Sequence, residues 1–86
     1  MQLTIAEALK RAEDACRRGD LRTARMIHGQ VLAILPDHVP ALLAAGDAAL
    51  ADADFGAAEA CFRHAGDLDP GRASPVIGLA QALAGQ

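Results

Sequence analysis

The chain has 86 residues and a net charge of −3, which allows one domain at most (1–86) and argues against a dedicated nucleic-acid binder. Hydrophobic residues make up 52% of the sequence but aromatic residues only 2%, with no Trp and no Tyr. Much of the apolar content is alanine and no segment alternates with period two, so the composition favours closely packed helices and argues against a sheet.

The first predicted helix begins after Thr4. Thr4 and Glu7 have the spacing of a capping box, and apolar residues recur behind them at helical spacing. The helix ends at Arg18-Gly19-Asp20, a tripeptide that is an adhesion signal in some secreted proteins. We interpret it here as a turn, in which Gly19 eases the helix end and Asp20 caps the next helix.

Prolines bound the second and third predicted helices. The second helix runs from Asp20 to about Leu35, where Pro36 stops it. Pro40 suits the first turn of a third helix, which extends to about Asp52. The residues between these prolines therefore form a short linker.

The last two predicted helices begin at polar caps. Asp54 caps a fourth helix that ends near Leu68. Ser74 and Pro75 have the pattern of an N-cap followed by a first-turn proline, and they open a fifth helix that runs to about Ala84.

These helices repeat at the interval that separates Pro36 from Pro70, which we call the repeat interval. Shifting the chain by this interval aligns five identical pairs: Leu9 with Leu43, Ala15 with Ala49, Asp20 with Asp54, Ala24 with Ala58, and Pro36 with Pro70. Other pairs match in type, and a third partial copy follows with Ile77 and Ala80. Such a period is typical of helical repeat proteins, in which each unit packs against its neighbours.

With this period the chain resembles tetratricopeptide repeats over essentially its whole length. The residues that carry the resemblance are Ala12, Gly46 and Ala80 at close helix crossings, Gly19-Asp20 and Ala53-Asp54 at turns, Ala24 and Ala58, and the closing Pro36 and Pro70. The resemblance implies an all-α fold: a right-handed superhelical array of antiparallel helix pairs. Repeats at about 5–38 and 39–72 would be followed by a half repeat or terminal capping helix at 73–86.

The chain departs from the family pattern in its first helices. Ala8 and Leu42 stand where the family usually has Trp, and Ala15 and Ala49 where it usually has Tyr. His28 occupies a place where an aromatic residue is common. We therefore expect a thinner and softer first repeat.

Residues for catalysis or metal binding are sparse. The sequence has no glycine-rich phosphate loop, and Cys16 and Cys61 lack the spacing of a metal motif or disulfide framework. A zinc site that combines Cys61 and His64 with Cys16 or His28 is an alternative interpretation, but packing or surface roles suit these residues better. We expect no enzyme activity, no cofactor and no bound metal.

The cellular location is predicted from the targeting and membrane-spanning signals that the sequence lacks. The chain has no signal-peptide pattern. Its longest uncharged stretch, Ala73 to Gln86, is shorter than the roughly 20 residues that a helix needs to cross a bilayer. These features predict a soluble cytoplasmic protein with no membrane insertion and no nucleic-acid partner.

The resemblance also places the first helix of each pair along a concave groove. The groove residues that it implies are Leu9, Glu13, Cys16, Arg17, Leu43, Asp47, Leu50, Ile77 and Gln81. They combine an apolar stripe with an acidic rim, whose complement is an amphipathic helix or extended peptide with aliphatic anchors and a Lys or Arg. The aliphatic residues equally fit a core between helices, and the acidic ones ordinary solvated charge, because periodicity alone does not separate two faces of a helix.

The terminal segment 73–86 contains no charged residue. Three interpretations follow: the helix caps the array despite its apolarity, a partner copy covers it, or the chain belongs to a longer array. Apolar patches of this kind tend to be contact sites, and the predicted self-association residues are Val76, Leu79 and Leu83.

Two functions remain open at this point. The leading hypothesis is a noncatalytic protein–protein interaction module that holds a protein or peptide partner in its groove, either alone or as a segment of a larger bacterial protein. The alternative is a self-assembling structural scaffold, a homo-oligomer joined through the terminal helix.

Overall fold

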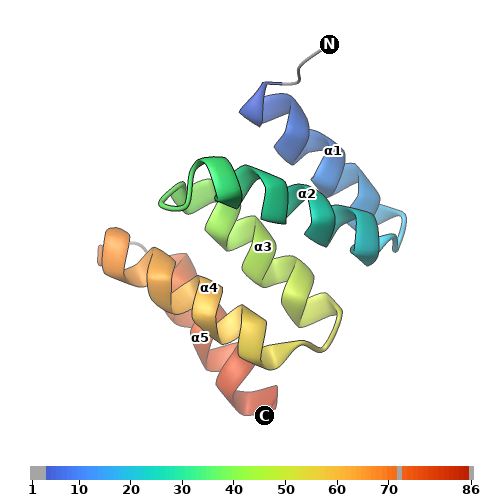
Figure 1. Ribbon diagram of the computed structural model, residues 1–86. Helices are drawn as coiled ribbons and strands as arrows, with labels where there is room; N and C mark the ends of the chain where they lie inside the picture. Colours follow the sequence, from blue (N-terminus) through green and yellow to red (C-terminus); the bar gives the residue numbers. More distant parts are fainter. Residues whose placement is uncertain (1–3, 72, 86) are drawn as a thin grey trace.

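The computed structural model describes residues 4–71 and 73–85, and within these ranges the chain forms helices and no strands (Figure 1). The five helices are α1 (Ile5–Arg17), α2 (Leu21–Ile34), α3 (Val39–Ala51), α4 (Phe55–Leu68) and α5 (Ala73–Gly85). The all-α prediction is thus confirmed. No described helix has both the length and the apolar character that crossing a membrane requires.

Consecutive helices run in opposite directions and pack against each other (Figure 1). Besides these sequential contacts, α3 packs against both α1 and α5, whereas the backbones of α2 and α4 stay apart. The helices therefore form two layers, with α1, α3 and α5 in one and α2 and α4 in the other. This arrangement places equivalent faces of α1 and α3 side by side.

Polar N-caps begin the first four helices. The side chains of Thr4, Asp20 and Asp54 each accept a hydrogen bond from the backbone N–H three residues later, as predicted. The helix α3 has a cap that the sequence did not reveal: the N–H of Ala41 donates to Nδ1 of His38 at 3.2 Å. His38, which lies in the predicted linker, is therefore a half-buried capping residue.

The start of α5 differs from the prediction. The helix already begins at Ala73, so Ser74 is its second residue and the predicted N-cap at Ser74 is wrong. The residue before Ala73 and the Ser74 side chain lie outside the described part of the chain. The other helix boundaries agree with the prediction to within one or two residues.

The tripeptide Arg18-Gly19-Asp20 is a helix-ending turn, as predicted. Gly19 has φ +79°, and Ala53, its equivalent in the turn between α3 and α4, has φ +56°. Glycine adopts this left-handed conformation without cost, whereas alanine does so with strain. In both turns the capping aspartate N–H donates at 2.8 Å to a carbonyl five residues earlier, so the two turns share one geometry.

The core includes two clusters that are rich in alanine. One cluster contains Ala49, Ala58, Phe62 and Ala82, and the other contains Ala12, Ala15 and Ala24. Small side chains let the helix backbones approach closely, so dispersion contacts replace bulky interlocking side chains. The larger side chain in the first cluster is Phe62, which is buried.

Phe62 of α4 lies between two glycines. A side-chain carbon added at Gly46 of α3 would lie 2.6 Å from the Phe62 ring, and one at Gly78 of α5 would lie 2.5 Å from it. The prediction that Ala80 marks the third close crossing is wrong, because Ala80 is exposed. The face of α5 that packs on α4 instead carries Gly78 and Ala82.

Candidate functional site

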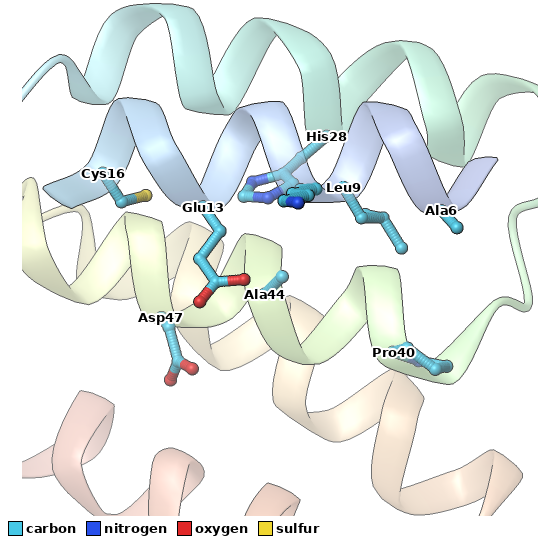
Figure 2. Close-up of a pocket in the computed structure, with 9 residues that line it drawn as sticks. Ala6, Leu9, Glu13, Cys16, His28, Pro40, Ala44 and Asp47 are labelled. Carbon is cyan, nitrogen blue, oxygen red and sulfur yellow. The ribbon is translucent and has the colours of Figure 1, made fainter. Parts of the chain in front are cut away.

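A cleft of about 770 Å³ lies between α1 and α3, with α2 behind it (Figure 2). Its lining comes from three helices and consists of Ala6, Leu9, Lys10, Glu13, Cys16, His28, Pro40, Ala44 and Asp47. Four of the nine predicted groove residues line this cleft: Leu9, Glu13, Cys16 and Asp47. The walls are mainly aliphatic and the charged groups lie along the edges, as in many ligand sites.

The two walls of the cleft are equivalent faces of two helices. Three pairs of lining residues are each separated by one repeat interval: Ala6 with Pro40, Lys10 with Ala44, and Glu13 with Asp47. Ala6 and Ala44 project little into the space between the helices (Figure 2). The internal repeat therefore builds the cleft, and small side chains keep it open.

The two carboxylates of the cleft differ in their partners. Glu13 pairs with Arg17, with 2.5 Å between Oε1 and Nη2, and both side chains are largely exposed. Asp47 has no hydrogen-bond or ion-pair partner among the described residues. The reason is visible in the sequence, because Ala51 stands in α3 where Arg17 stands in α1.

The unpaired carboxylate of Asp47 is partly removed from water. Although Asp47 is an exposed residue at the edge of the cleft, the neighbouring walls desolvate part of its carboxylate, and this raises its pKa above the ordinary value. A charged group without a partner at such a place is destabilising, and an incoming cation would relieve the cost. Asp47 therefore offers a cation an unpaired partner, in a cleft that Lys10 also lines.

Cys16 is a half-buried thiol at the same end of the cleft. Burial raises the pKa of Cys16, and the nearby carboxylates of Asp47 and Glu13 raise it further. Reactive cysteines need the opposite environment, with positive charge that stabilises the thiolate. Cys16 is thus an apolar wall residue, which also packs against the cluster of Ala12, Ala15 and Ala24.

His28 lies at the back of the cleft and is only 3% exposed. Its Nδ1 atom is buried and has no hydrogen-bond partner among the described residues. Burial lowers the pKa of His28, so the ring is neutral at neutral pH. A smaller cavity of about 150 Å³, formed by residues of α2, α3 and α4, also borders the ring, so His28 separates two hollows.

The other predicted groove residues lie elsewhere. Leu43 and Leu50 are half-buried and pack against the cluster that contains Phe62. Ile77 and Gln81 are exposed on α5 and do not line the cleft, and Arg17 contributes only through its ion pair with Glu13.

The predicted self-association residues do not share one environment. Leu79 packs against the Phe62 cluster, whereas Leu83 is 46% exposed. The side chain of Val76 lies outside the described part of the chain. The exposed apolar face of α5 instead includes Ile77, which is 58% exposed.

Five lining residues were missed in the sequence: Ala6, Lys10, His28, Pro40 and Ala44. Four of them are two pairs separated by the repeat interval, so extending the Leu9 and Glu13 ladders around the helix would have found them. His28 carries no such signal, because its equivalent at 62 is a core phenylalanine. Its place in the cleft depends on how far α1 and α3 stand apart.

Within residues 4–71 and 73–85, no three His, Cys, Asp or Glu side chains are grouped to hold a metal ion. Cys61 lines the smaller cavity, and His64 contacts Asp37, with 2.9 Å between Nε2 and Oδ1. Comparison with models of known protein families and with curated protein sequences gives no match.

Proposed function

We propose that this chain is a noncatalytic, tetratricopeptide-like interaction module that binds a basic peptide or helix in the cleft between α1 and α3. The observation that carries the proposal is the unpaired, partly desolvated carboxylate of Asp47 beside aliphatic walls. The ligand that fits combines an aliphatic side chain, for Leu9 and Ala44, with a Lys or Arg for Asp47.

The length of the cleft supports a short contact segment. Ala6 and Glu13 are seven residues apart on α1, and their equivalents on α3 have the same separation, which corresponds to about 10 Å along each helix. About two turns of a ligand helix, or a few extended residues, fit this length. Acidic groups are disfavoured at the end of the cleft that Glu13 and Asp47 share, while Lys10 lies one helical turn before Glu13 on α1.

A pair of peptides tests the proposal. The probe is a labelled amphipathic peptide of roughly 12 residues with two Leu and one Arg on one face, and its twin carries Glu in place of Arg. Fluorescence anisotropy should show binding of the Arg peptide and none of the Glu peptide. Asp47→Asn should weaken binding by about threefold to tenfold, which corresponds to about 0.7–1.4 kcal/mol.

Two further variants sharpen this test. Ala51→Arg gives Asp47 the partner that Arg17 gives Glu13, so it should weaken binding although the carboxylate remains. Asp67→Asn removes one charge from an exposed position of α4 and should leave the affinity unchanged. Equal binding of the Arg and Glu peptides, or equal effects of Asp47→Asn and Asp67→Asn, would contradict the proposal.

A second candidate function, self-association through α5, is supported by a comparison of equivalent positions. Ala15 and Ala49 are buried beneath the second helix of their pairs, whereas Leu83 at the same position of α5 is exposed. Ile77 and the exposed Ala80 extend this apolar face. A second copy of α5 would bury it.

Sedimentation velocity tests self-association directly, because it measures the oligomeric state. Leu83→Glu should shift the protein to monomer, whereas the control Ile34→Glu, at a 71% exposed position of α2, should leave the assembly unchanged. A wild-type protein that is monomeric at high micromolar concentration would exclude self-association through α5.

A further inference from the structure

Lys10 supplies a positive charge to the wall of the cleft that α1 forms. Its side chain is exposed, and no ion pair joins it to a carboxylate within residues 4–71 and 73–85. Its equivalent on the opposite wall is Ala44, which carries no charge. The cleft therefore offers a ligand an unpaired cation on α1 and, in Asp47, an unpaired carboxylate on α3.

These two charges lie at different levels of the cleft. Asp47 is equivalent to Glu13, which lies three residues after Lys10 on α1. Three residues correspond to about 4.5 Å along a helix, so Lys10 lies about one turn nearer to the end of the cleft that Ala6 lines. Glu13 already has Arg17 as its partner. The charge that is available to a ligand therefore changes along the cleft, from positive toward Ala6 to negative at Asp47.

We infer that the cleft binds a helical segment in one direction, with an acidic side chain paired to Lys10 and a basic one, a turn away, paired to Asp47. This inference rests on the proposed function and adds a second charge and a direction to its ligand. Residues three or four apart on a helix share one face and lie about 5–6 Å apart, which is comparable to the offset between Lys10 and Asp47. The opposite direction would bring like charges together, which is unfavourable.

The two pairs contribute differently to binding. The carboxylate of Asp47 is partly desolvated, so its pairing with a cation contributes most of the electrostatic affinity. Lys10 is exposed, and ion pairs of exposed side chains are weak because water and salt screen them. Lys10 therefore affects the direction of the ligand more than its affinity, and an acidic side chain alone is too weak an anchor.

Two peptides of identical composition test the direction. Both are amphipathic helices of roughly 12 residues with two Leu on one face; Glu precedes Arg by four residues in the first peptide, and the two are exchanged in the second. Each carries a nitroxide spin label at its N-terminus, and NMR measures which amide resonances of the protein the label broadens. The first peptide should broaden Ala6 more than Cys16, because its acidic end lies toward Lys10. The second peptide should broaden Cys16 more than Ala6.

Lys10→Met removes the cation and keeps an unbranched side chain of similar length. It should weaken binding of the first peptide by about twofold to threefold, and the label should then broaden both ends of the cleft. A third peptide, with Gln in place of Glu, should lose less than about 1.5-fold in affinity for the same variant. The control is Arg11→Met, which removes the same charge from the next residue of α1, whose side chain lines a separate hollow with Arg18 and Thr23. This control should change neither the direction nor the affinity.

The outcomes separate the inference from the proposed function. If the peptides bind but the charge order does not decide their direction, or if Lys10→Met weakens the Glu and Gln peptides equally, the inference is overturned and the proposed function stands. An affinity that falls as the protein concentration rises would show that a second copy occupies the cleft, which also overturns the inference. If no peptide binds, both the inference and the proposed function fail.

Discussion

The two helix pairs, α1–α2 and α3–α4, share their lengths, turns and capping aspartates but differ in how their interior is filled. In the second pair Phe62 closes the space between Gly46 and Gly78. At the equivalent position of the first pair stands His28, and both the cleft and the smaller cavity border its ring. One backbone plan therefore yields a close-packed unit and a hollow one, and the candidate site lies where the hollow unit meets α3 of the close-packed one.

The largest expected loss of stability comes from removing the Phe62 side chain from the close-packed pair. Phe62→Ala should lower the free energy of unfolding by about 3–5 kcal/mol, because it removes the aromatic side chain of the main cluster. A chain of this size has roughly 4–13 kcal/mol in total, so much of the variant should be unfolded at 37 °C. Urea denaturation followed by circular dichroism measures the change.

The matched change in the hollow pair is His28→Ala. It should cost clearly less, because cavities already border the ring and because a desolvated, unpartnered nitrogen is removed. Equal losses for the two variants would show that the pairs are packed alike and would break the comparison.

A smaller effect is expected from filling the gap beside Phe62. Gly46→Ala should destabilise the protein by about 1–3 kcal/mol, because the added carbon would press on the ring from 2.6 Å. The control is Gly29→Ala on α2, where no atom lies within 4 Å of the new carbon. This control should stabilise the protein by about 0.5–1 kcal/mol, since alanine is the better helix former. A Gly46→Ala variant as stable as Gly29→Ala would show that α3 and α4 can move apart freely.

The capping aspartates Asp20 and Asp54 differ in their side-chain partners, and a further pair of variants measures what this difference contributes to stability. Asp20 caps α2 alone, whereas Asp54 caps α4 and also accepts from Arg25 of α2 at 2.7 Å. Asp54→Ala should therefore lower Tm more than Asp20→Ala does. Asp54→Asn should lower Tm less than Asp54→Ala, because asparagine can still cap. Neither aspartate lines the cleft, so affinity for the basic peptide should be unaffected.

The pH dependence of the Tm of these two variants follows from the direction in which folding shifts the pKa of each aspartate. The hydrogen bond from Arg25 is the main cause that lowers the pKa of Asp54, and hydrogen bonds from Thr23 lower that of Asp20. A lowered carboxyl pKa contributes stability above its ordinary pKa that is lost as the pH falls through the folded-state pKa. The Tm differences should therefore shrink as the pH falls below the ordinary carboxyl pKa, and differences that do not change with pH would assign the effect to something other than the ionised caps.

The helices were predictable because local signals define them. Thr4, Asp20 and Asp54 cap helices through side-chain oxygens. Pro36 prevents α2 from continuing, because proline lacks the backbone N–H that a helix interior needs. His38 was missed because a ring nitrogen rarely caps a helix. The exposure of Ala80 was missed because the repeat predicts a position on a face but not whether another helix covers it.

The site was predictable only in part. The repeat interval placed Glu13 and Asp47 together, since that depends on the helical period alone. The same interval assigned Leu43 to the groove, whereas it packs half-buried against the core cluster, because a small rotation of α3 moves a residue between these faces. The orphan nitrogen of His28 depends on all of its neighbours at once, and a linear sequence does not contain that information.

The smallest expected effect concerns the charge of Asp47. Because desolvation raises its pKa, stability should be complete below its ordinary pKa and should decrease as the pH rises through the higher folded-state pKa. Asp47→Asn removes this loss, so it should slightly raise the free energy of unfolding at pH 7 and have no effect near pH 3; solvent screening of this exposed group keeps the gain small.

Glu13→Gln provides the matched variant in the first pair. It loses an exposed ion pair with Arg17, so it should leave stability unchanged or slightly reduced at pH 7. If Asp47→Asn is no more stable than wild type at pH 7, the Asp47 carboxylate is as well solvated as any surface acid and does not favour a cation in the cleft. If it is more stable but binds the basic peptide less tightly, Asp47 opposes folding and favours binding, which is the behaviour of a residue whose partner is the ligand.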